Sequence, residues 1–272
     1  MDNHSSQNEF EFGLAIDPGR KRKDAPNEDL AAVIEADPMI SHPPLLIVAD
    51  GLGGHQGGAT ASRIVADVFK WQYRQIQHPT DYLELLNTCA RKAHMAVRVH
   101  GSQEAELSDM GSTIVAVVLT EDKMHMLNVG DSRAYIIRGQ KIIQISQDQS
   151  WVGEQVRAGL ITHQQAMKDK RRNRLNMAIT AKRSEIKPYS VEETLKLDDV
   201  VVLCSDGLWG PVPESLIWAC ATELAPQAAA DKLVALANHL QGPDNISVIV
   251  ARRINLERTP VTVNMEESNP GE

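Results

Sequence analysis

The sequence predicts an α+β protein, an αββα sandwich of two mainly antiparallel sheets flanked by helix pairs, with a flap subdomain. Short apolar, β-branched segments bounded by turn residues recur along the chain. Two long stretches with helical spacing of apolar residues follow the third of these strands, and two shorter ones precede the last strand. Strands and helices therefore do not alternate singly, as they would in a doubly wound parallel sheet.

The first part of the chain predicts three strands and two helices. The strands are expected over 10–16, 31–34 and 45–49. Ile64, Val65 and Val68 repeat at helical spacing and predict an amphipathic helix over 60–77. A second helix is expected between Pro79 and Gly101, long enough to lie beside the first.

The second part of the chain predicts a meander, a flap, two more helices and two more strands. The meander is expected over 113–119, 124–129, 134–137 and 142–145. Residues 148–182 are polar and basic and lack a strong apolar face, which favours a surface flap. The remaining elements are strands over 200–204 and 246–251 and helices over 213–224 and 227–241. We expect one domain over 10–254, after a flexible N-terminus (1–9) and before a disordered tail (255–272).

Composition limits the classes of partner. With a net charge of −8, the chain is not expected to bind nucleic acid or a membrane surface electrostatically. No apolar stretch approaches the ~18–20 residues of a membrane helix, and the N-terminus lacks the features of a signal peptide. Three cysteines in apolar contexts indicate buried free thiols in a reducing compartment. We expect a cytoplasmic protein that is a monomer.

Acidic side chains recur at the ends of the predicted strands. They stand in Asn27-Glu28-Asp29, Asp50-Gly51, Gly130-Asp131, Asp206-Gly207 and Asp244-Asn245. One Asp-Gly alone indicates a turn, but strand ends converge in a sandwich, so the set favours one shared cleft. Two unit charges ~4 Å apart repel by about 4 kcal/mol at an effective dielectric near 20, so a bound cation is expected. Oxygen ligands without thiolates or paired histidines suit Mg²⁺ or Mn²⁺.

The ordered motifs identify a family resemblance. They are Asp17-x-Gly19, Arg22, Asn27-Glu28-Asp29, the glycine-rich run Ala49–Gly58, Gly111-Ser-Thr113, Asn128–Tyr135, Cys204–Leu208 and Asp244-Asn245. In this order, over residues 12–252, the set resembles the metal-dependent protein phosphatases of type 2C, and most of all their compact bacterial members. The resemblance implies two antiparallel sheets flanked by helix pairs, with a two-metal site at one end.

The same resemblance implies a set of metal ligands. Asp50 would bridge both ions, and Asp206 and Asp244 would complete the first site. Glu28 and the Gly51 carbonyl would hold the second ion. Two further acids have secondary parts: Asp29 would order metal-bound water, and Asp131, with Asp206, would bind a third, looser ion.

Two cations can activate a shared water for attack on phosphorus, so no nucleophilic side chain is required. Arg22 is the candidate for gripping the phosphate, since a guanidinium can pair with two oxygens. Its spacing from Asn27 leaves Arg20 as an alternative phosphate ligand. The non-functional alternative is that Arg22 only belongs to a basic loop exposed to solvent. His55 either donates a proton to the departing alkoxide or holds the glycine loop.

These features predict a Mg²⁺/Mn²⁺-dependent phosphatase that hydrolyses phosphoserine and phosphothreonine in proteins, with substrates made by a cognate serine/threonine kinase. The alternative is a catalytically silent family member that regulates by binding phosphoproteins. A third hypothesis is a two-metal phosphoesterase for small phosphates. The flap carries Asp169-Lys170 where the family often has His-Pro, so no flap-based substrate preference is carried over.

Overall fold

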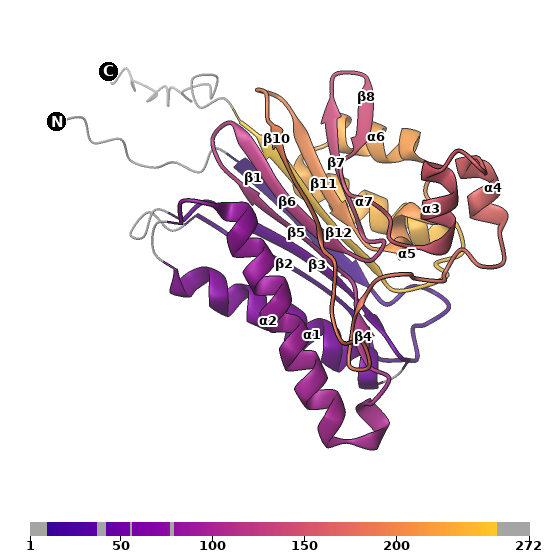
Figure 1. Cartoon of the computed structure of the whole chain (residues 1–272). Helices are drawn as coiled ribbons and strands as arrows, with labels where there is room; N and C mark the ends of the chain where they lie inside the picture. Colours follow the sequence, from indigo (N-terminus) through magenta and orange to yellow (C-terminus); the bar gives the residue numbers. More distant parts are fainter. Residues whose placement is uncertain (1–9, 37–41, 55, 77–78, 255–272) are drawn as a thin grey trace, which may run out of the picture.

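The computed structural model describes residues 10–36, 42–54, 56–76 and 79–254. Two antiparallel sheets lie face to face, with helices on the outer face of each (Figure 1). The predicted αββα sandwich is confirmed. The predicted N-terminal segment 1–9 and tail 255–272 lie outside the described residues.

The first sheet has five strands. Their order is β1 (Phe10–Asp17), β12 (Ile246–Arg253), β11 (Val200–Cys204), β7 (Arg133–Arg138) and β8 (Lys141–Gln144). The first and last strands of the domain therefore pair directly, with Phe10 opposite Arg253 and Asp17 opposite Ile246. This pairing brings the loop after β1 next to the loop before β12.

The second sheet has seven strands. Its path is β10 (Tyr189–Thr194), β6 (Lys123–Val129), β5 (Ile114–Leu119), β3 (Leu45–Leu52), β4 (Gly111–Ser112) and β9 (Ile179–Thr180), with β2 (Asp29–Ile34) paired to β3. The strand β3 is longer than predicted, so Asp50 lies inside it rather than beyond its end. The cause is pairing on both sides, since Asp50 is opposite Asp29 of β2 and Gly51 is opposite Ser112 of β4.

Helices cover both outer faces of the sandwich. Two long helices, α1 (Gln56–Gln75) and α2 (Tyr82–Gln103), cover the second sheet, and η1 (Ala105–Leu107) follows them (Figure 1). The short α5 (Asp206–Trp209), α6 (Glu214–Glu223) and α7 (Pro226–His239) cover the first sheet. The predicted flap contains α3 (Trp151–Arg157) and α4 (His163–Lys168), which stand beside α5 at one end of the sandwich (Figure 1).

The interior has three apolar layers, and β3 shows how one strand serves two of them. Leu45, Ile47 and Ala49 pack toward α1 and α2. Leu46 and Val48 pack into the layer between the two sheets. A strand buried on both faces needs an unbroken apolar sequence, which explains the run that predicted it.

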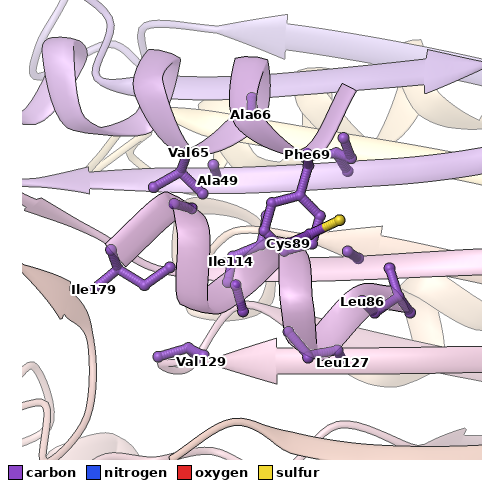
Figure 2. Close-up of a cluster of buried hydrophobic side chains, with 14 of the residues drawn as sticks. Ala49, Val65, Ala66, Phe69, Leu86, Cys89, Ile114, Leu127, Val129 and Ile179 are labelled. Atoms are coloured by element: carbon purple, nitrogen blue, oxygen red, sulfur yellow. The ribbon is translucent and has the colours of Figure 1, made fainter. Parts of the chain in front are cut away.

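Phe69 lies at the centre of the layer between the helices and the second sheet, close to Cys89 of α2 (Figure 2). We expect Phe69→Ala to lower the free energy of unfolding by about 3–5 kcal/mol, because it deletes a fully buried ring and leaves a cavity. Trp71→Ala is the matched control, since its side chain is 58% exposed and its loss should change stability by no more than ~0.5 kcal/mol. Urea denaturation of both variants measures the difference, and equal losses would contradict the assigned core.

The strand β10 was not predicted, because its sequence YSVEET ends in charged residues that lie exposed. It is an edge strand whose place is set by its pairing with β6, from Tyr189 opposite Asn128 to Thr194 opposite Lys123. Such a strand depends on its neighbour more than on its own apolar pattern.

All three cysteines are free and buried, as predicted. In the part of the chain that the structure describes, no helix has the length and apolarity needed to cross a membrane. The cytoplasmic location stays a prediction.

Candidate metal centre

The centre begins where β2 and β3 pair. Asp29 and Asp50 stand directly opposite each other in this antiparallel ladder. Asp29 is buried, and its Oδ2 accepts a hydrogen bond of 2.6 Å from the Ser205 hydroxyl, just before α5. The backbone N–H of Ser247 in turn donates to the Ser205 oxygen (3.0 Å). Residues from both sheets thus meet at one end of the sandwich.

The backbone of Asp50 is fixed by the Gly111-Ser-Thr113 segment. Asp50 N–H donates to the Thr113 hydroxyl (3.1 Å), and Thr113 N–H donates to the Asp50 carbonyl (2.8 Å). The Ser112 hydroxyl donates to the same carbonyl (3.1 Å). This reciprocal pairing holds Asp50 in place while leaving its carboxylate free of these bonds.

Glycine is required where β3 leaves the sheet. A Cβ atom at Gly51 would lie 2.4 Å from the Gly58 carbonyl oxygen and 2.6 Å from the Glu28 carbonyl oxygen. Gly51 N–H also donates to Glu28 O (3.1 Å). The start of α1 can therefore pack against this backbone only if residue 51 has no side chain, and at Gly58 a Cβ atom would lie 2.8 Å from the Glu28 carboxylate carbon. This close approach accounts for part of the glycine run that follows Asp50.

Arg22 forms ion pairs with two of the predicted metal ligands. Its Nη2 lies 2.8 Å from Glu28 Oε2, and its Nη1 lies 2.5 Å from Asp244 Oδ1. Asn245 joins the same two loops, since its Oδ1 accepts from Glu28 N–H (2.8 Å) and its Nδ2 donates to the Pro18 carbonyl (2.9 Å). The acids at either end of the sequence are thereby held together.

The aspartates act strongly on one another. Burial, followed by repulsion from Asp29, Asp206, Asp131 and Asp244, raises the pKa of Asp50 well above its ordinary value. Burial with repulsion from Asp206 and Asp244 raises the pKa of Asp29 to about 7 despite the Ser205 hydrogen bond. Burial and the charge of Asp244 raise the pKa of Asp206 to about 6. The arrangement therefore disfavours five negative charges unless a cation is present.

The donor atoms fit a hard divalent cation. Glu28 Oε1 and Asp29 Oδ1 are buried, and neither has a hydrogen-bond partner among the described residues. Buried carboxylate oxygens without partners are expensive unless they bind a cation. Within the same described ranges, no three acidic, histidine or cysteine side chains already form a compact metal cluster.

Asp131 is held by an aromatic and cationic network. Its carbonyl accepts a hydrogen bond from Trp209 Nε1 (3.0 Å), and the Arg133 guanidinium lies 3.8 Å from the centre of the Trp209 ring. Arg133 also pairs with Asp148 (2.7 Å) and donates to the Tyr135 hydroxyl (3.0 Å). Burial and repulsion from Asp206 and Asp148 raise the pKa of Asp131 well above its ordinary value.

The remaining predicted residues are placed as follows. His55 lies outside the described residues. The side chain of Arg20 is exposed, and its backbone N–H bonds to Asn238 Oδ1 (3.0 Å). Of the two arginines considered for phosphate binding, Arg22 is therefore the one that points into the acid cluster.

A cavity of about 670 Å³ opens beside this centre. Its lining includes Asp131, Asp206 and Asp244 on one side and flap residues such as Val152, Ala166 and Arg172 on the other. The flap helices α3 and α4 thus stand over the acids.

The family model for protein phosphatase 2C matches residues 18–242. The chain belongs to the protein phosphatase 2C family. The serine/threonine phosphatase stp of Listeria monocytogenes is similar to it, with 31% identity over 233 residues that cover 84% of this chain and 90% of the relative.

Solved structures agree with this family. The crystal structure of the Mycobacterium tuberculosis serine/threonine phosphatase PstP has a TM-score of 0.81 and 29% identity, and the match covers 90% of this chain and 99% of that one. The catalytic domain of PstP in complex with two manganese ions has a TM-score of 0.79 and 29% identity, with coverage of 90% and 99%. The two-sheet architecture is therefore that of the protein phosphatase 2C fold.

In this protein phosphatase 2C member, the sequence did not indicate which residues support the acids. Ser205 bonds to Asp29, Thr113 fixes Asp50, and Trp209 holds the Asp131 carbonyl. Ser205 and Thr113 lie within the motifs that indicated the family, but their roles depend on pairing between distant strands. The available signal was that Ser205 directly precedes Asp206 and that Thr113 lies two residues after Gly111.

Proposed function

We propose that the chain is a Mg²⁺- or Mn²⁺-dependent phosphatase that hydrolyses phosphoserine and phosphothreonine in proteins. The observation that carries this function is the group of acids that raise one another's pKa at one end of the sandwich, with unpartnered buried oxygens on Glu28 and Asp29. Family membership and the two manganese ions of PstP support it. The substrates are proposed to be phosphoproteins made by a serine/threonine kinase.

We propose the same metal ligands that the family resemblance implies. Asp50 would contact both ions, Asp206 and Asp244 would hold the first, and Glu28 with the Gly51 carbonyl would hold the second. The carbonyl of Gly51 is suited to this because the residue has no side chain in the space beside Glu28. Asp131 is proposed to help bind a third, weaker ion together with Asp206.

When bound, the divalent ions would supply Lewis acidity that activates water and polarises the phosphoryl oxygens. Asp29, oriented by Ser205, would accept a hydrogen bond from the attacking water. Arg22 would bind the phosphate, since its guanidinium already lies against Glu28 and Asp244. His55 is proposed as the group that protonates the leaving alkoxide.

A cysteine nucleophile does not fit the chain. Burial raises the pKa of the Cys89 thiol to about 12 and that of the Cys204 thiol to about 12, and it also raises the pKa of the Cys220 thiol. A buried thiol with such a pKa is not a thiolate at neutral pH. The chemistry therefore rests on the acid cluster.

The test is phosphate release from a phosphothreonine peptide and from a small aryl phosphate, with Mn²⁺ and with chelator. Release that requires Mn²⁺ is the expected result. A folded protein that binds the peptide without releasing phosphate would favour the catalytically silent regulator. Activity that persists in the presence of chelator would contradict the metal-dependent mechanism.

Arg22→Ala is expected to reduce kcat/KM for the aryl phosphate by roughly 10–100-fold, because hydrogen bonds to a charged group contribute about 1.5–3 kcal/mol. The loss should lie mainly in KM, and Arg22→Lys should recover part of it. Arg20→Ala is the matched control and should stay within about twofold, since its side chain is exposed. Steady-state kinetics at saturating Mn²⁺ measure both variants. If Arg20→Ala had the larger effect, the assignment of Arg22 would be wrong.

A further inference from the structure

Nine of the 28 Lys and Arg residues are concentrated in two short segments. One is the loop Arg20-Lys-Arg-Lys23, and the other is the flap segment Lys168-Asp-Lys-Arg-Arg-Asn-Arg174. The chain as a whole carries a net charge of −8, so these segments stand out from its surface. We call them the basic loop and the basic flap segment.

The two segments border the same cavity. Lys21 of the basic loop and Arg172 and Asn173 of the basic flap segment line it, together with Asp206 and Asp244. The charges of Arg172 and Arg22 both act on the Asp206 carboxyl. A peptide whose phosphorylated residue reached the acid centre would therefore pass between the two segments.

Most of these cations have no acidic partner. Arg22 is paired with Glu28 and Asp244, and Arg171 with Asp169. Among the described residues, no ion pair is formed by the other seven, which are Arg20, Lys21, Lys23, Lys168, Lys170, Arg172 and Arg174. All seven are exposed. Uncompensated like charges at a cavity mouth repel one another and attract anions.

The basic flap segment has a defined conformation. The Arg171 guanidinium lies 3.3 Å from the centre of the Trp151 ring and 3.0 Å from Asp169 Oδ2. Trp151 N–H donates to the Arg174 carbonyl (2.8 Å), and Arg172 N–H donates to the Asp169 carbonyl (3.1 Å). The turn is thus fixed to the start of α3, with Arg171 held against Trp151 and with Arg172 and Asn173 lining the cavity.

One phosphate group cannot account for so many free cations, because it carries a charge of only about −1.5 to −2 and would be held at the acid centre. We propose that the basic loop and the basic flap segment form a substrate-binding surface for phosphoprotein segments in which acidic residues flank the phosphorylated residue. This inference rests on the proposed function and names its preferred substrate class. Flanking carboxylates would pair with the free lysines and arginines on either side of the cavity.

The test compares three phosphothreonine peptides of equal length, with acidic, neutral or basic residues around the phosphothreonine. The small aryl phosphate serves as a substrate without flanks. One double variant reverses charge on each segment: Lys168→Glu with Lys170→Glu on the basic flap segment, and Arg20→Glu with Lys23→Glu on the basic loop. The matched control is Arg63→Glu with Arg74→Glu, which makes the same change of net charge on exposed positions of α1.

We expect the wild type to favour the acidic peptide over the neutral one by about tenfold in kcat/KM at low salt, mainly through KM, because several exposed charge pairs each contribute a little. The preference should shrink at high salt. Each segment's double variant should lose most of the preference for the acidic peptide while keeping aryl phosphate turnover within twofold. The α1 control should keep that preference. Equal kcat/KM for the three peptides, or a preference that survives both segment variants, would overturn the proposal.

Failure of the proposed function is separable from failure of this surface. If the aryl phosphate is not hydrolysed with Mn²⁺, the same peptides can still be compared by fluorescence anisotropy in binding. Selective binding of the acidic peptide that is lost in the segment variants would support the surface. If a DNA oligonucleotide of matched charge displaced the acidic peptide as well as the unlabelled peptide does, the surface would bind polyanions in general. That result would overturn the proposed substrate class.

Discussion

Asp206→Asn is expected to abolish most phosphate release while leaving the protein folded. Lewis acid assistance by a metal ion contributes several kcal/mol, and each 1.36 kcal/mol is a factor of ten in rate, so kcat should fall by roughly 10²–10⁴-fold. Asp206 is the first residue of α5, and its charge acts on Asp29, Asp50 and Asp131. An amide at this position keeps the size of the side chain but provides a neutral and much weaker ligand.

The protein should still fold after this substitution, because the charged carboxylate that is removed does not stabilise the folded state. Its pKa is raised by burial and by repulsion from Asp244, which means that the folded state disfavours its charge. A matched control is Asp198→Asn, at an exposed residue with φ of 67°, a conformation that asparagine also adopts readily. Titration with Mn²⁺, followed by calorimetry and by aryl phosphate turnover, separates lost binding from lost chemistry. Full activity of Asp206→Asn with unchanged Mn²⁺ affinity would remove Asp206 from the centre.

The architecture was predictable because it depends on local patterns. The run Leu45–Ala49 indicated a strand buried on two faces, and the structure places its alternate residues in two different apolar layers. The spacing of apolar residues likewise indicated α1 and α2. The edge strand β10 was not predictable, since its charged half is exposed and only its register with β6 makes it a strand.

The acids of the site were predictable, but their contacts were not. Repetition of aspartate at strand ends indicated a shared cleft without any knowledge of the sheet order. That Asp29 lies opposite Asp50 depends on the register of β2 and β3. That Arg22 reaches Asp244, 222 residues away in the chain, depends on the pairing of the first and last strands. Such long-range contacts leave no periodicity in the sequence.

The protein kept free of metal by a chelator, called the chelated protein below, is expected to become less stable as the pH rises from about 5 to 7.5. The pKa of Asp29 is about 7 and that of Asp206 about 6 in the folded protein, whereas an aspartate in an unfolded chain has a pKa of about 3.9. The folded protein therefore retains protons that the unfolded chain has already released. Stability from these groups is full below about pH 4 and is lost as the pH passes through the folded pKa values.

The change should be large enough for thermal unfolding to resolve. A pKa difference of one between the two states is worth about 1.4 kcal/mol, so a loss of a few kcal/mol and a fall in Tm of roughly 5–15 °C are expected. Mn²⁺ at about 100 times its Kd should restore about 2.7 kcal/mol at pH 7.5, because it binds the ionised carboxylates of the folded state. Differential scanning calorimetry at several pH values, with chelator and with Mn²⁺, measures both effects.

Asp50→Asn distinguishes this cause from a general pH effect. Asp50 experiences repulsion from four other aspartates, so its neutral replacement should make the chelated protein more stable at pH 7.5 and flatten the dependence of Tm on pH. The same variant should gain little stability from Mn²⁺, since the residue proposed to contact both ions is lost. The control Asp198→Asn should behave like the wild type in all three respects. A chelated wild type whose Tm rises between pH 5 and 7.5, or an Asp50→Asn protein that Mn²⁺ stabilises fully, would show that these carboxylates do not form the metal centre.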